Sequence, residues 1–392
     1  MIKINRFTNP RSILQLEKVL DKRRVIQNKN ISVVSKILKD IRKNKNKALI
    51  KYEKKFSKNN RIKPSLREIN NAIGSLNPKV KKAIDYAYNR VFKYHSLQKV
   101  KNINYKDKLK NTFHYKSVPI NKVGVYVPAN LPSTLLMTAI PAKIAGVKKI
   151  ILANPRINNK INPAVIYVAK KLGIKEIYSI GGAQAIGSLT YIQKVDKIVG
   201  PGNIYVTEAK KKVFGDVGVE GMVAGPSEIT VVADKKTDLN SVITSLIGQA
   251  EHDVNSQSIL ISKDLSVLKE IKNLIKTNLK NLPRRKIAKK SLKANGLLIH
   301  AKNDKNVIDL LNLIAPEHLE INISKPKKYI NKIVNAGSIC IGKYSAMAVT
   351  DYNAGTNHVL PTMGSAKFSS GLNVSDFYKK ISYINLSKKG IE

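Results

Sequence analysis

The sequence predicts an α/β protein with two Rossmann-like domains, each built on a parallel sheet. The chain also has a helical N-terminal region and a short C-terminal segment. From residue 123 onwards, short apolar runs rich in β-branched residues alternate with segments of helical periodicity. Several of these runs end at glycine or Pro-Gly, which marks turns from strand to helix. The alternation resumes after Asp238, which favours two units of similar style. Strands that alternate with helices form βαβ units and parallel sheets.

The N-terminal region 26–100 is predicted to be helical. The stretches 31–56 and 65–92 carry apolar residues at helical spacing. Ser65 followed by Glu68 has the spacing of a capping box, in which each residue bonds the other's backbone at the start of a helix.

The first alternating region contains β-rich runs that end at turn residues, each followed by an amphipathic or apolar helix. The expected strands are 123–127, 150–154, 176–180 and 229–234, and the short run 197–200 leads into Pro201-Gly202. The expected helices are 135–146, which continues through Pro141, then 163–173, a segment after Gly182, and 203–214.

The second alternating region repeats this pattern and ends in a long polar stretch. The expected elements are helices at 241–253, 266–279 and 307–314 and strands at 257–262, 296–301 and 338–342. Residues 344–373 are rich in Gly, Ser, Thr and Asn and predict a structured loop, a place where function is common. We therefore expect an N-terminal arm (1–25), a larger discontinuous domain (26–122 plus 235–368), a second domain (123–234) and a C-terminal segment (369–392).

The net charge is extreme and raises nucleic-acid binding as a rival function. The chain has 71 Lys and Arg against 26 Asp and Glu, a net charge of +45. The excess is mostly Lys and accompanies abundant Asn and Ile, the composition that codons rich in A and T supply. Lysine is dense in 34–120 and 263–307, without the interleaved aromatic residues that bind single strands. We interpret the charge as a solvated surface and expect no nucleic-acid partner.

The compartment is predicted to be the cytoplasm. The single cysteine, Cys340, excludes an internal disulfide and fits a reducing environment. No apolar run approaches the ~20 residues of a membrane span, and the N-terminus lacks the apolar stretch of a secretory signal. We expect no membrane partner.

Three glycine-rich turns follow predicted strands. Glycine allows backbone N–H groups to approach a ligand closely, and a following helix N-terminus attracts phosphate. None has the GxGxxG pattern of dinucleotide sites, so ordinary strand-to-helix turns are the alternative. The turns are Gly181-Gly182-Ala183-Gln184, Gly200-Pro201-Gly202-Asn203 and Ala224-Gly225-Pro226-Ser227.

Two polar pairs are candidates for chemistry. Gln249 and His252 are three residues apart on a predicted helix, so a carbonyl oxygen and an imidazole would share one face and could bind a metal. A polar helix surface is the alternative. Pro316 is suited to start a helical turn, which would hold Glu317 and His318 side by side as proton-transfer groups. A charged helix start is the alternative.

The polar loop adds Asp351 and His358, which could bind a metal or cap local turns. The remaining histidines, His95, His114 and His300, lie in predicted helices or strands, and we assign them structural roles.

The order and wording of these segments resemble one family. The segments VGVYVP, MTAIPAKIAGVKKIILANP, GGAQAIG, VDKIVGPGNIYVTEAK, AGPSEITVVAD, QAEHD, APEHLEI, DYNAGTNHVLPT and FSSGLNVSDF occur in this order. Together they closely resemble histidinol dehydrogenase, from about residue 30 to residue 386. The resemblance implies oxidation of L-histidinol to L-histidinaldehyde and then to L-histidine by two NAD⁺ in turn, in a homodimer with one zinc ion per subunit that holds the substrate.

The resemblance also implies residue roles. His318 would take the alcohol proton, and Glu317 would activate the water that adds to the aldehyde. Further roles by analogy are zinc ligation by Gln249, His252 and Asp351, NAD contacts by Tyr126, Gln184 and Asn203, and substrate contacts by Ser227 and His358 in addition to His318 and the zinc ligands.

The sequence departs from the family pattern at two places. The usual VPGG is replaced by Val127-Pro128-Ala129-Asn130, in a shorter loop, which bears on NAD affinity. Family members also carry a C-terminal tail with a substrate-binding glutamate and a further histidine ligand of the zinc, and no histidine follows His358 here. We therefore expect zinc to be held weakly unless water or another residue fills that position. Alternatives are a truncated, impaired enzyme or a relative that oxidises another amino or hydroxy alcohol.

Overall fold

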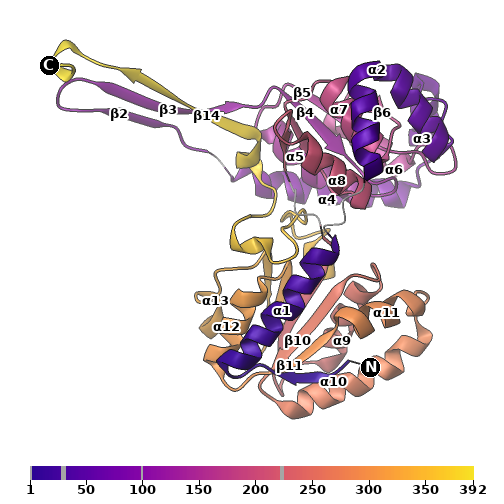
Figure 1. Ribbon diagram of the computed structural model, residues 1–392, viewed down its shortest axis with the longest axis vertical. Helices are drawn as coiled ribbons and strands as arrows, with labels where there is room; N and C mark the ends of the chain where they lie inside the picture. Colours follow the sequence, from indigo (N-terminus) through magenta and orange to yellow (C-terminus); the bar gives the residue numbers. More distant parts are fainter. Residues whose placement is uncertain (1, 28–31, 99, 221–224) are drawn as a thin grey trace. The chain divides into compact units, whose positions relative to one another are not determined.

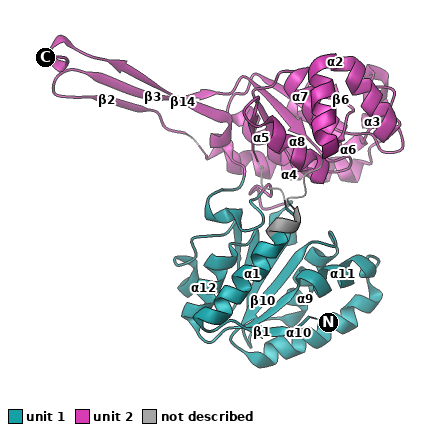
Figure 2. Ribbon diagram, in the orientation of Figure 1, with its two compact units in different colours: residues 1–30, 223–352, 360–371 teal, residues 31–222, 353–359, 372–392 magenta. Residues whose placement is uncertain are grey.

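The structure is a computed structural model that describes residues 2–27, 32–98, 100–220 and 225–392. Figure 2 shows two compact units. Unit 1 comprises Met1–Asn30, Val223–Tyr352 and Leu360–Gly371, and unit 2 comprises Ile31–Met222, Asn353–Val359 and Leu372–Glu392. Ile31 of the first expected helix and Ala224 of the third glycine turn lie outside the described residues.

Unit 2 contains a parallel sheet of five strands in the order β6-β5-β4-β7-β8. In chain order these are the third, second, first, fourth and fifth strands, so the direction of winding reverses between β4 and β7. This doubly wound arrangement confirms the predicted fold class. The strands are β4 (Lys122–Tyr126), β5 (Lys149–Ala153), β6 (Glu176–Tyr178), β7 (Lys197–Val199) and β8 (Gly218–Val219). The connecting helices are α5 (Pro132–Ile144), α6 (Pro163–Leu172), α7 (Gly182–Tyr191) and α8 (Ile204–Val213).

Helix α5 continues through Pro141 because another residue replaces the missing hydrogen bond. Proline has no N–H, so the carbonyl of Met137, four residues earlier, loses its helical partner. The side-chain amide of Asn357 donates to that carbonyl at 2.7 Å. The bond satisfies a polar group in a buried helix, where an unpaired carbonyl would be costly. Among the described helices, none is long and apolar enough to cross a lipid bilayer.

The helical N-terminal region packs on unit 2. It forms α2 (Ser32–Ser57), α3 (Leu66–Ser75) and α4 (Pro78–Ser96). The capping box of Ser65 and Glu68 is present, with bonds of 3.2 and 2.9 Å. The expected helix 65–92 is broken because Pro78 disfavours helical geometry in the residue before it and is itself suited to begin a helix. Asn77 caps that new start.

Unit 2 also contains an antiparallel sheet that the sequence analysis did not identify. Its order is β14-β3-β2, from β14 (Tyr378–Asn385), β3 (Thr112–Pro119) and β2 (Ile103–Lys106). Figure 1 shows these strands as a long ribbon. Their residues are exposed or half-buried. The short apolar alternation of β2 and β3, in which Ile103 and Tyr105 lie opposite Tyr115 and Phe113, was not recognised as a strand signal.

Unit 1 contains a second parallel sheet, with six strands in the order β1-β11-β10-β9-β12-β13. Its last five strands repeat the order found in unit 2, and β1 extends the edge beside β11. The strands are β1 (Ile4–Arg6), β9 (Glu228–Ala233), β10 (Gln257–Ser262), β11 (Leu297–His300), β12 (His318–Asn322) and β13 (Ser338–Ile341). The helices are α1 (Pro10–Gln27), α9 (Leu239–Ala250), α10 (Leu265–Asn278), α11 (Arg285–Asn295), α12 (Asp304–Ile314), α13 (Lys327–Ile330) and α14 (Met347–Thr350).

The grouping of segments differs from the expected one. Residues 1–25 are not a separate arm, because β1 pairs with β11 and α1 packs against α12. The segment 31–122 groups with 123–222 rather than with 235–368, because α2 packs against α7 and α4 packs against α5. Such contacts join elements far apart in sequence, so local periodicity does not reveal them.

Gly200 is a position where unit 2 requires glycine. Its φ is +108°, and an added Cβ would lie 2.0 Å from the carbonyl oxygen of Tyr126. Gly173 also has a positive φ, +74°, but no atom lies within 4 Å of its added Cβ.

We predict that Gly173→Ala costs roughly 1–2 kcal/mol of unfolding free energy, from backbone strain alone. Gly200→Ala should cost about 4 kcal/mol or more, because a steric clash is added. Urea unfolding followed by circular dichroism measures both, and equal losses would contradict the assigned clash.

Candidate active site

The candidate catalytic pair lies where strand β12 begins. His318 is the first residue of that strand and pairs with Ile229 of β9 and Ser338 of β13. The expected helical turn after Pro316 is therefore wrong. The segment enters the middle of a sheet and is buried on both faces, a setting in which strand pairing decides the conformation. Glu317 and His318 are nevertheless adjacent, and both are buried, with 6% and 3% of their surface exposed.

The imidazole of His318 lies between two carboxylates. Its Nε2 is 3.0 Å from Oδ1 of Asp351, and its Nδ1 is 3.7 Å from Oε2 of Glu317. Burial disfavours the charged imidazolium, but the hydrogen bonds and charges of Asp351 and Glu317 outweigh it and hold the pKa of His318 well above its ordinary value of 6.5. The two carboxylates therefore stabilise the charge that the imidazole carries when it holds a proton.

Glu317 is oriented by the backbone of the neighbouring strand. Its Oε2 accepts a hydrogen bond of 2.7 Å from the N–H of Glu228, at the start of β9. Among the described residues, the hydrogen bonds made by the carboxylate involve Oε2, so Oε1 is available to a ligand or water.

Asp351 is presented by the short helix α14, which Glu320 anchors. Oε1 of Glu320 accepts hydrogen bonds from the N–H of Met347, at 2.7 Å, and from Ser245, at 3.1 Å. One turn later, the N–H of Asp351 donates to the carbonyl of Met347 at 2.9 Å. Burial raises the pKa of Glu320, and these donors oppose the shift. Glu320 was not predicted to take part in the site. An acidic residue inside an apolar strand is the sequence feature that could have indicated it.

Arg23 and Glu228 form a second unexpected pair behind Glu317. The guanidinium of Arg23 lies 2.9 Å from Glu228, and both side chains are at least nine-tenths buried. Burial raises the pKa of Glu228, and the charge and hydrogen bond of Arg23 lower it. The same guanidinium donates to Gln257 at the start of β10. The pair fixes the strand ends whose backbone orients Glu317.

The expected metal ligands Gln249 and His252 are not both helical. Helix α9 ends at Ala250, and His252 lies exposed in the turn that follows, with its N–H bonded to the carbonyl of Gln249. Gln249 and His252 therefore do not share one face of a helix. Helix α9 runs from the carboxyl end of β9 to the amino end of β10, so its last turn lies at the same edge of the sheet as His318.

The side chain of Gln249 fits a ligand role. It is 1% exposed, and its Nε2 has no hydrogen-bond partner. A buried amide atom without a hydrogen-bond partner needs an explanation. The nitrogen and oxygen of a glutamine amide can be exchanged by a 180° flip of the group. After that flip, the carbonyl oxygen would occupy the unpartnered position and could bind a cation. The described residues contain no cluster of three or more His, Cys, Asp or Glu suited to a metal. The expected set does not require one, because it combines two such residues with a glutamine.

The other histidines and Ser227 occupy defined places. Ser227 precedes β9 in unit 1, whereas His358 belongs to unit 2. The three histidines given structural roles all contact nearby polar groups: His95 the carbonyl of Val91, His114 the side chain of Asn104, and His300 the carbonyl of Lys263.

The expected NAD contacts all lie in unit 2, and two of them meet around a buried glutamate. Oε1 of Glu53 accepts from the amide of Gln184 and from the N–H of Gly181, both at 2.9 Å. The hydroxyl of Tyr126 lies 3.4 Å from the N–H of Gly182. Burial raises the pKa of Tyr126, so this hydroxyl keeps its proton. Glu53 was not predicted, since it lies in a lysine-rich helix.

Tyr126 ends β4 beside the end of β7, where the winding of the sheet reverses. Ligands of doubly wound sheets commonly bind at this reversal, at the carboxyl ends of the strands. Gly200 follows β7, and its carbonyl accepts from the buried Lys210 at 2.9 Å. Burial lowers the pKa of Lys210 to about 8. Asn203 caps α8 by accepting from the N–H groups of Tyr205 and Val206.

Comparisons with known proteins agree with the motifs. The family described as histidinol dehydrogenase matches residues 20–392. Histidinol dehydrogenase of Pelagibacter ubique is 57% identical, over 100% of this chain and 93% of that protein. The enzyme of Lactiplantibacillus plantarum is 41% identical, over 92% and 86%. The crystal structure of histidinol dehydrogenase from Elizabethkingia anophelis has a TM-score of 0.89 and 36% identity, over 100% and 92%.

We predict that Arg23→Ala destabilises the protein in a pH-dependent way. Removing one partner of a buried ion pair leaves the other charge uncompensated and costs about 3–5 kcal/mol. Without Arg23, the pKa of Glu228 should rise further above its unfolded value. A carboxyl whose pKa is raised by folding contributes stability below its unfolded pKa, and this contribution is lost as pH rises through its folded pKa. The loss of unfolding free energy in Arg23→Ala should therefore be larger at about pH 7.5 than at about pH 5.

Urea unfolding of Arg23→Ala at both pH values measures this deficit. Arg23→Lys is the control, because it retains the charge and should restore most of the neutral-pH stability. A deficit in Arg23→Ala that is the same at both pH values would contradict the pairing with Glu228.

Proposed function

Because the chain belongs to the histidinol dehydrogenase family and is therefore a dehydrogenase, we propose that it oxidises L-histidinol through L-histidinaldehyde to L-histidine, with two NAD⁺. The observation that carries this proposal is the buried arrangement of Glu317, His318 and Asp351 in unit 1. In that arrangement the imidazole of His318 and the carboxylate of Glu317 lie side by side, which supports a reaction that needs two proton-transfer groups.

The first proposed task belongs to His318. An alcohol loses hydride only as its hydroxyl proton is removed, so a base must contact that oxygen. His318 accepts this proton, and Asp351 and Glu317 stabilise the imidazolium that results.

The second proposed task belongs to Glu317. Oxidation of an aldehyde to an acid needs water to add to the carbonyl, and a nearby base must take the proton of that water. The Glu228 N–H holds one oxygen of Glu317, and Oε1 accepts the water proton. The two adjacent residues thus divide the two proton transfers.

Unit 2 is proposed to hold NAD⁺, which accepts the hydride. Tyr126 and Gln184 offer polar groups beside the Gly181-Gly182 turn, and Gly200 and Asn203 form the turn before α8. Both turns lie at the carboxyl edge of the sheet, and the one at Gly200 lies beside the reversal of winding. Close backbone approach and a helix N-terminus favour a pyrophosphate at such a place.

Zinc is proposed to be held by Gln249, His252 and Asp351. When bound, it would hold the amino alcohol by direct coordination. Asp351 has two carboxylate oxygens, so one can bind a cation while the other accepts from His318. Ser227 and His358 are proposed substrate contacts. A homodimer and a cytoplasmic location complete the proposal. The homodimer rests on the motif resemblance, and the location rests on the single cysteine and on the absence of long apolar runs in the sequence.

The proposal is tested with the purified chain, L-histidinol, NAD⁺ and zinc, by following the absorbance of NADH. Two NADH per histidinol and the appearance of histidine are expected. Other amino and hydroxy alcohols serve as competing substrates, and preference for one of them would replace histidinol in the proposal. A salt-titrated DNA-binding assay tests the rival function that the +45 charge suggests.

Glu317→Gln should separate the two oxidations. The amide retains an oxygen that accepts from Glu228 but cannot take a proton from water. Oxidation of supplied histidinaldehyde should fall by roughly 10²–10⁴-fold, and the first NADH formed from histidinol should be affected much less. His318→Ala should impair both oxidations, because the hydrated aldehyde, like the alcohol, must lose a hydroxyl proton as its hydride leaves. Equal damage to the two steps in Glu317→Gln would refute the division of tasks.

His252→Ala should weaken zinc binding. Loss of a residue that only supports a metal ligand costs about 10–100-fold in affinity, so loss of a direct ligand should cost at least that. His300→Ala is the matched control, because His300 is also a histidine of unit 1 but contacts the carbonyl of Lys263. Competition with a chromophoric chelator measures the affinity without an activity assay. If both variants bind zinc like the unaltered chain, His252 is not a ligand.

A further inference from the structure

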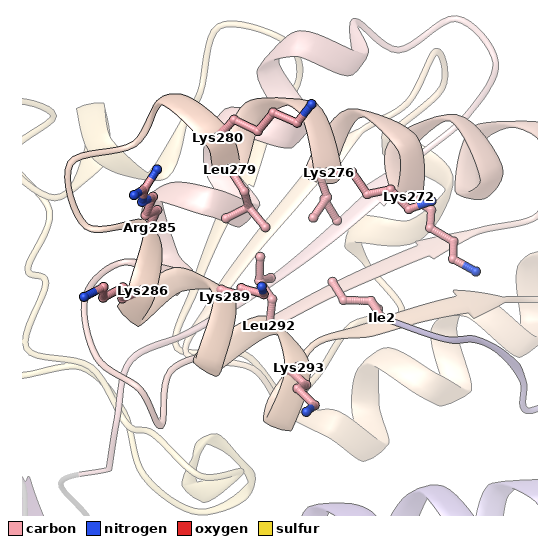
Figure 3. A pocket seen from close by; sticks show the side chains of 11 residues that line it. Ile2, Lys272, Lys276, Leu279, Lys280, Arg285, Lys286, Lys289, Leu292 and Lys293 are labelled. Carbon is pink, nitrogen blue, oxygen red and sulfur yellow. The ribbon is translucent and has the colours of Figure 1, made fainter.

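Unit 1 has an apolar hollow surrounded by cationic side chains. It lies between α10 and α11, beside Ile2, and has a volume of about 470 Å³. Figure 3 shows Ile2 and Leu279 directed into the hollow, with the ammonium groups of Lys280, Lys286 and Lys293 around its margin. None of the residues proposed for the oxidation lines it.

The charge around this hollow exceeds what the composition explains. Lys and Arg make up 71 of 392 residues, so eleven residues taken at random would include about two. The hollow has eleven lining residues, of which seven are Lys or Arg and none is acidic. None of these seven cations forms an ion pair with any part of the chain that the structure describes. The local excess of positive charge is therefore uncompensated, which favours an anionic ligand.

The floor of the hollow demands a different chemistry. Ile2, Ile275, Leu279 and Leu292 supply its apolar surface, and the methylene stems of the lysines extend it towards the rim. Water in this part of the hollow forms few hydrogen bonds with the protein, because the floor is apolar. Ligand pockets commonly enclose about 300–1,000 Å³ and combine apolar walls with a few polar groups. A molecule with an apolar chain and an anionic head matches both the floor and the rim.

Larger partners match the hollow less well. Single-stranded nucleic acid is held by aromatic stacking, and no aromatic residue lines the hollow. A membrane surface is bound by apolar side chains that project into it, whereas these are recessed. A second copy of the chain would have to supply negative charge, and the chain has only 26 acidic residues against 71 basic ones.

We propose that the hollow between α10 and α11 binds a free, single-chain anionic amphiphile, such as a medium-chain fatty-acid carboxylate. The chain packs on Ile275, Leu279 and Leu292, and the head group pairs with the surrounding ammonium groups. The site is separate from the proposed oxidation chemistry, so its test does not depend on that function.

Calorimetric titration of the full chain with octanoate and decanoate, below their micelle concentrations, tests the proposal. Affinity should rise about fourfold per added methylene, the fold-change that corresponds to ~0.8 kcal/mol. Decanol, which lacks the charge, should bind at least about tenfold more weakly than decanoate, a difference of 1.4 kcal/mol. Affinity that is independent of chain length or of charge would overturn the proposal. Binding to phosphatidylglycerol vesicles without binding to decanoate would overturn it in favour of a membrane surface.

Paired variants localise the site. Lys289→Glu with Lys293→Glu changes two lining residues and should weaken decanoate binding by about tenfold or more. Lys269→Glu with Lys290→Glu makes the same change in net charge on exposed positions of the same two helices that do not line the hollow. In physiological salt, this control should change the affinity by about twofold or less.

A floor variant keeps the test independent of charge and of folding. Leu279→Gln should weaken decanoate binding while thermal unfolding stays close to that of the unaltered chain, because Leu279 is only half-buried. If both charge pairs weaken binding equally, or if Leu279→Gln has no effect, the ligand is held by the general positive field and the assigned site is wrong.

Discussion

The pairing of β9 with β12 is the constraint on which the candidate active site depends. It aligns Ile229 with His318, so the residues just before them, Glu228 and Glu317, meet at one edge of the sheet. The N–H of Glu228 can then orient the Glu317 carboxylate, and Arg23 can neutralise the charge that Glu228 brings into the interior. A one-residue shift in this register would turn the side chains of β12 to the opposite face of the sheet. The chemistry of the site is therefore encoded in strand pairing as much as in side chains.

The two units share one order of five strands, but their candidate sites lie at opposite edges of the sheets. In unit 2 the glycine turns and Tyr126 lie at the carboxyl ends of the strands, the usual ligand edge of doubly wound sheets. In unit 1, Glu317, His318 and Ser227 lie at the amino ends, and the last turn of α9 brings Gln249 to the same edge. The usual position of ligands therefore predicts the candidate site in unit 2 but not the one in unit 1. In unit 1, Glu320 bonds the start of helix α14, and Asp351, which follows that helix, contacts His318.

Much of the fold could be predicted from sequence because periodicity and turn residues are local. The capping box at Ser65 is confirmed, as are the strands and helices that were expected in the two parallel sheets and the family that the motifs resemble. Strands β1, β8 and β12 and helix α11 were not expected. The strand at His318 was mistaken for a helical turn because Pro316 suits either, and only pairing with β9 and β13 decides between them. The supporting residues Arg23, Glu53, Glu228 and Glu320 escaped prediction because their partners are distant in sequence. The ribbon of β2, β3 and β14 was overlooked because its apolar alternation is short, as at Ile103 and Tyr105, and is exposed rather than buried in a core.

The bond between Asn357 and the carbonyl that Pro141 leaves unpaired has an evolutionary consequence. Proline at position 141 is tolerated only while residue 357 supplies a donor, and an alanine at 141 would let the helix satisfy itself and release residue 357 from that duty. The two positions should therefore change together among descendants of this sequence, although 216 residues separate them. Asn357 stands six residues from Asp351, so the segment that carries a candidate site residue also supports the integrity of a helix.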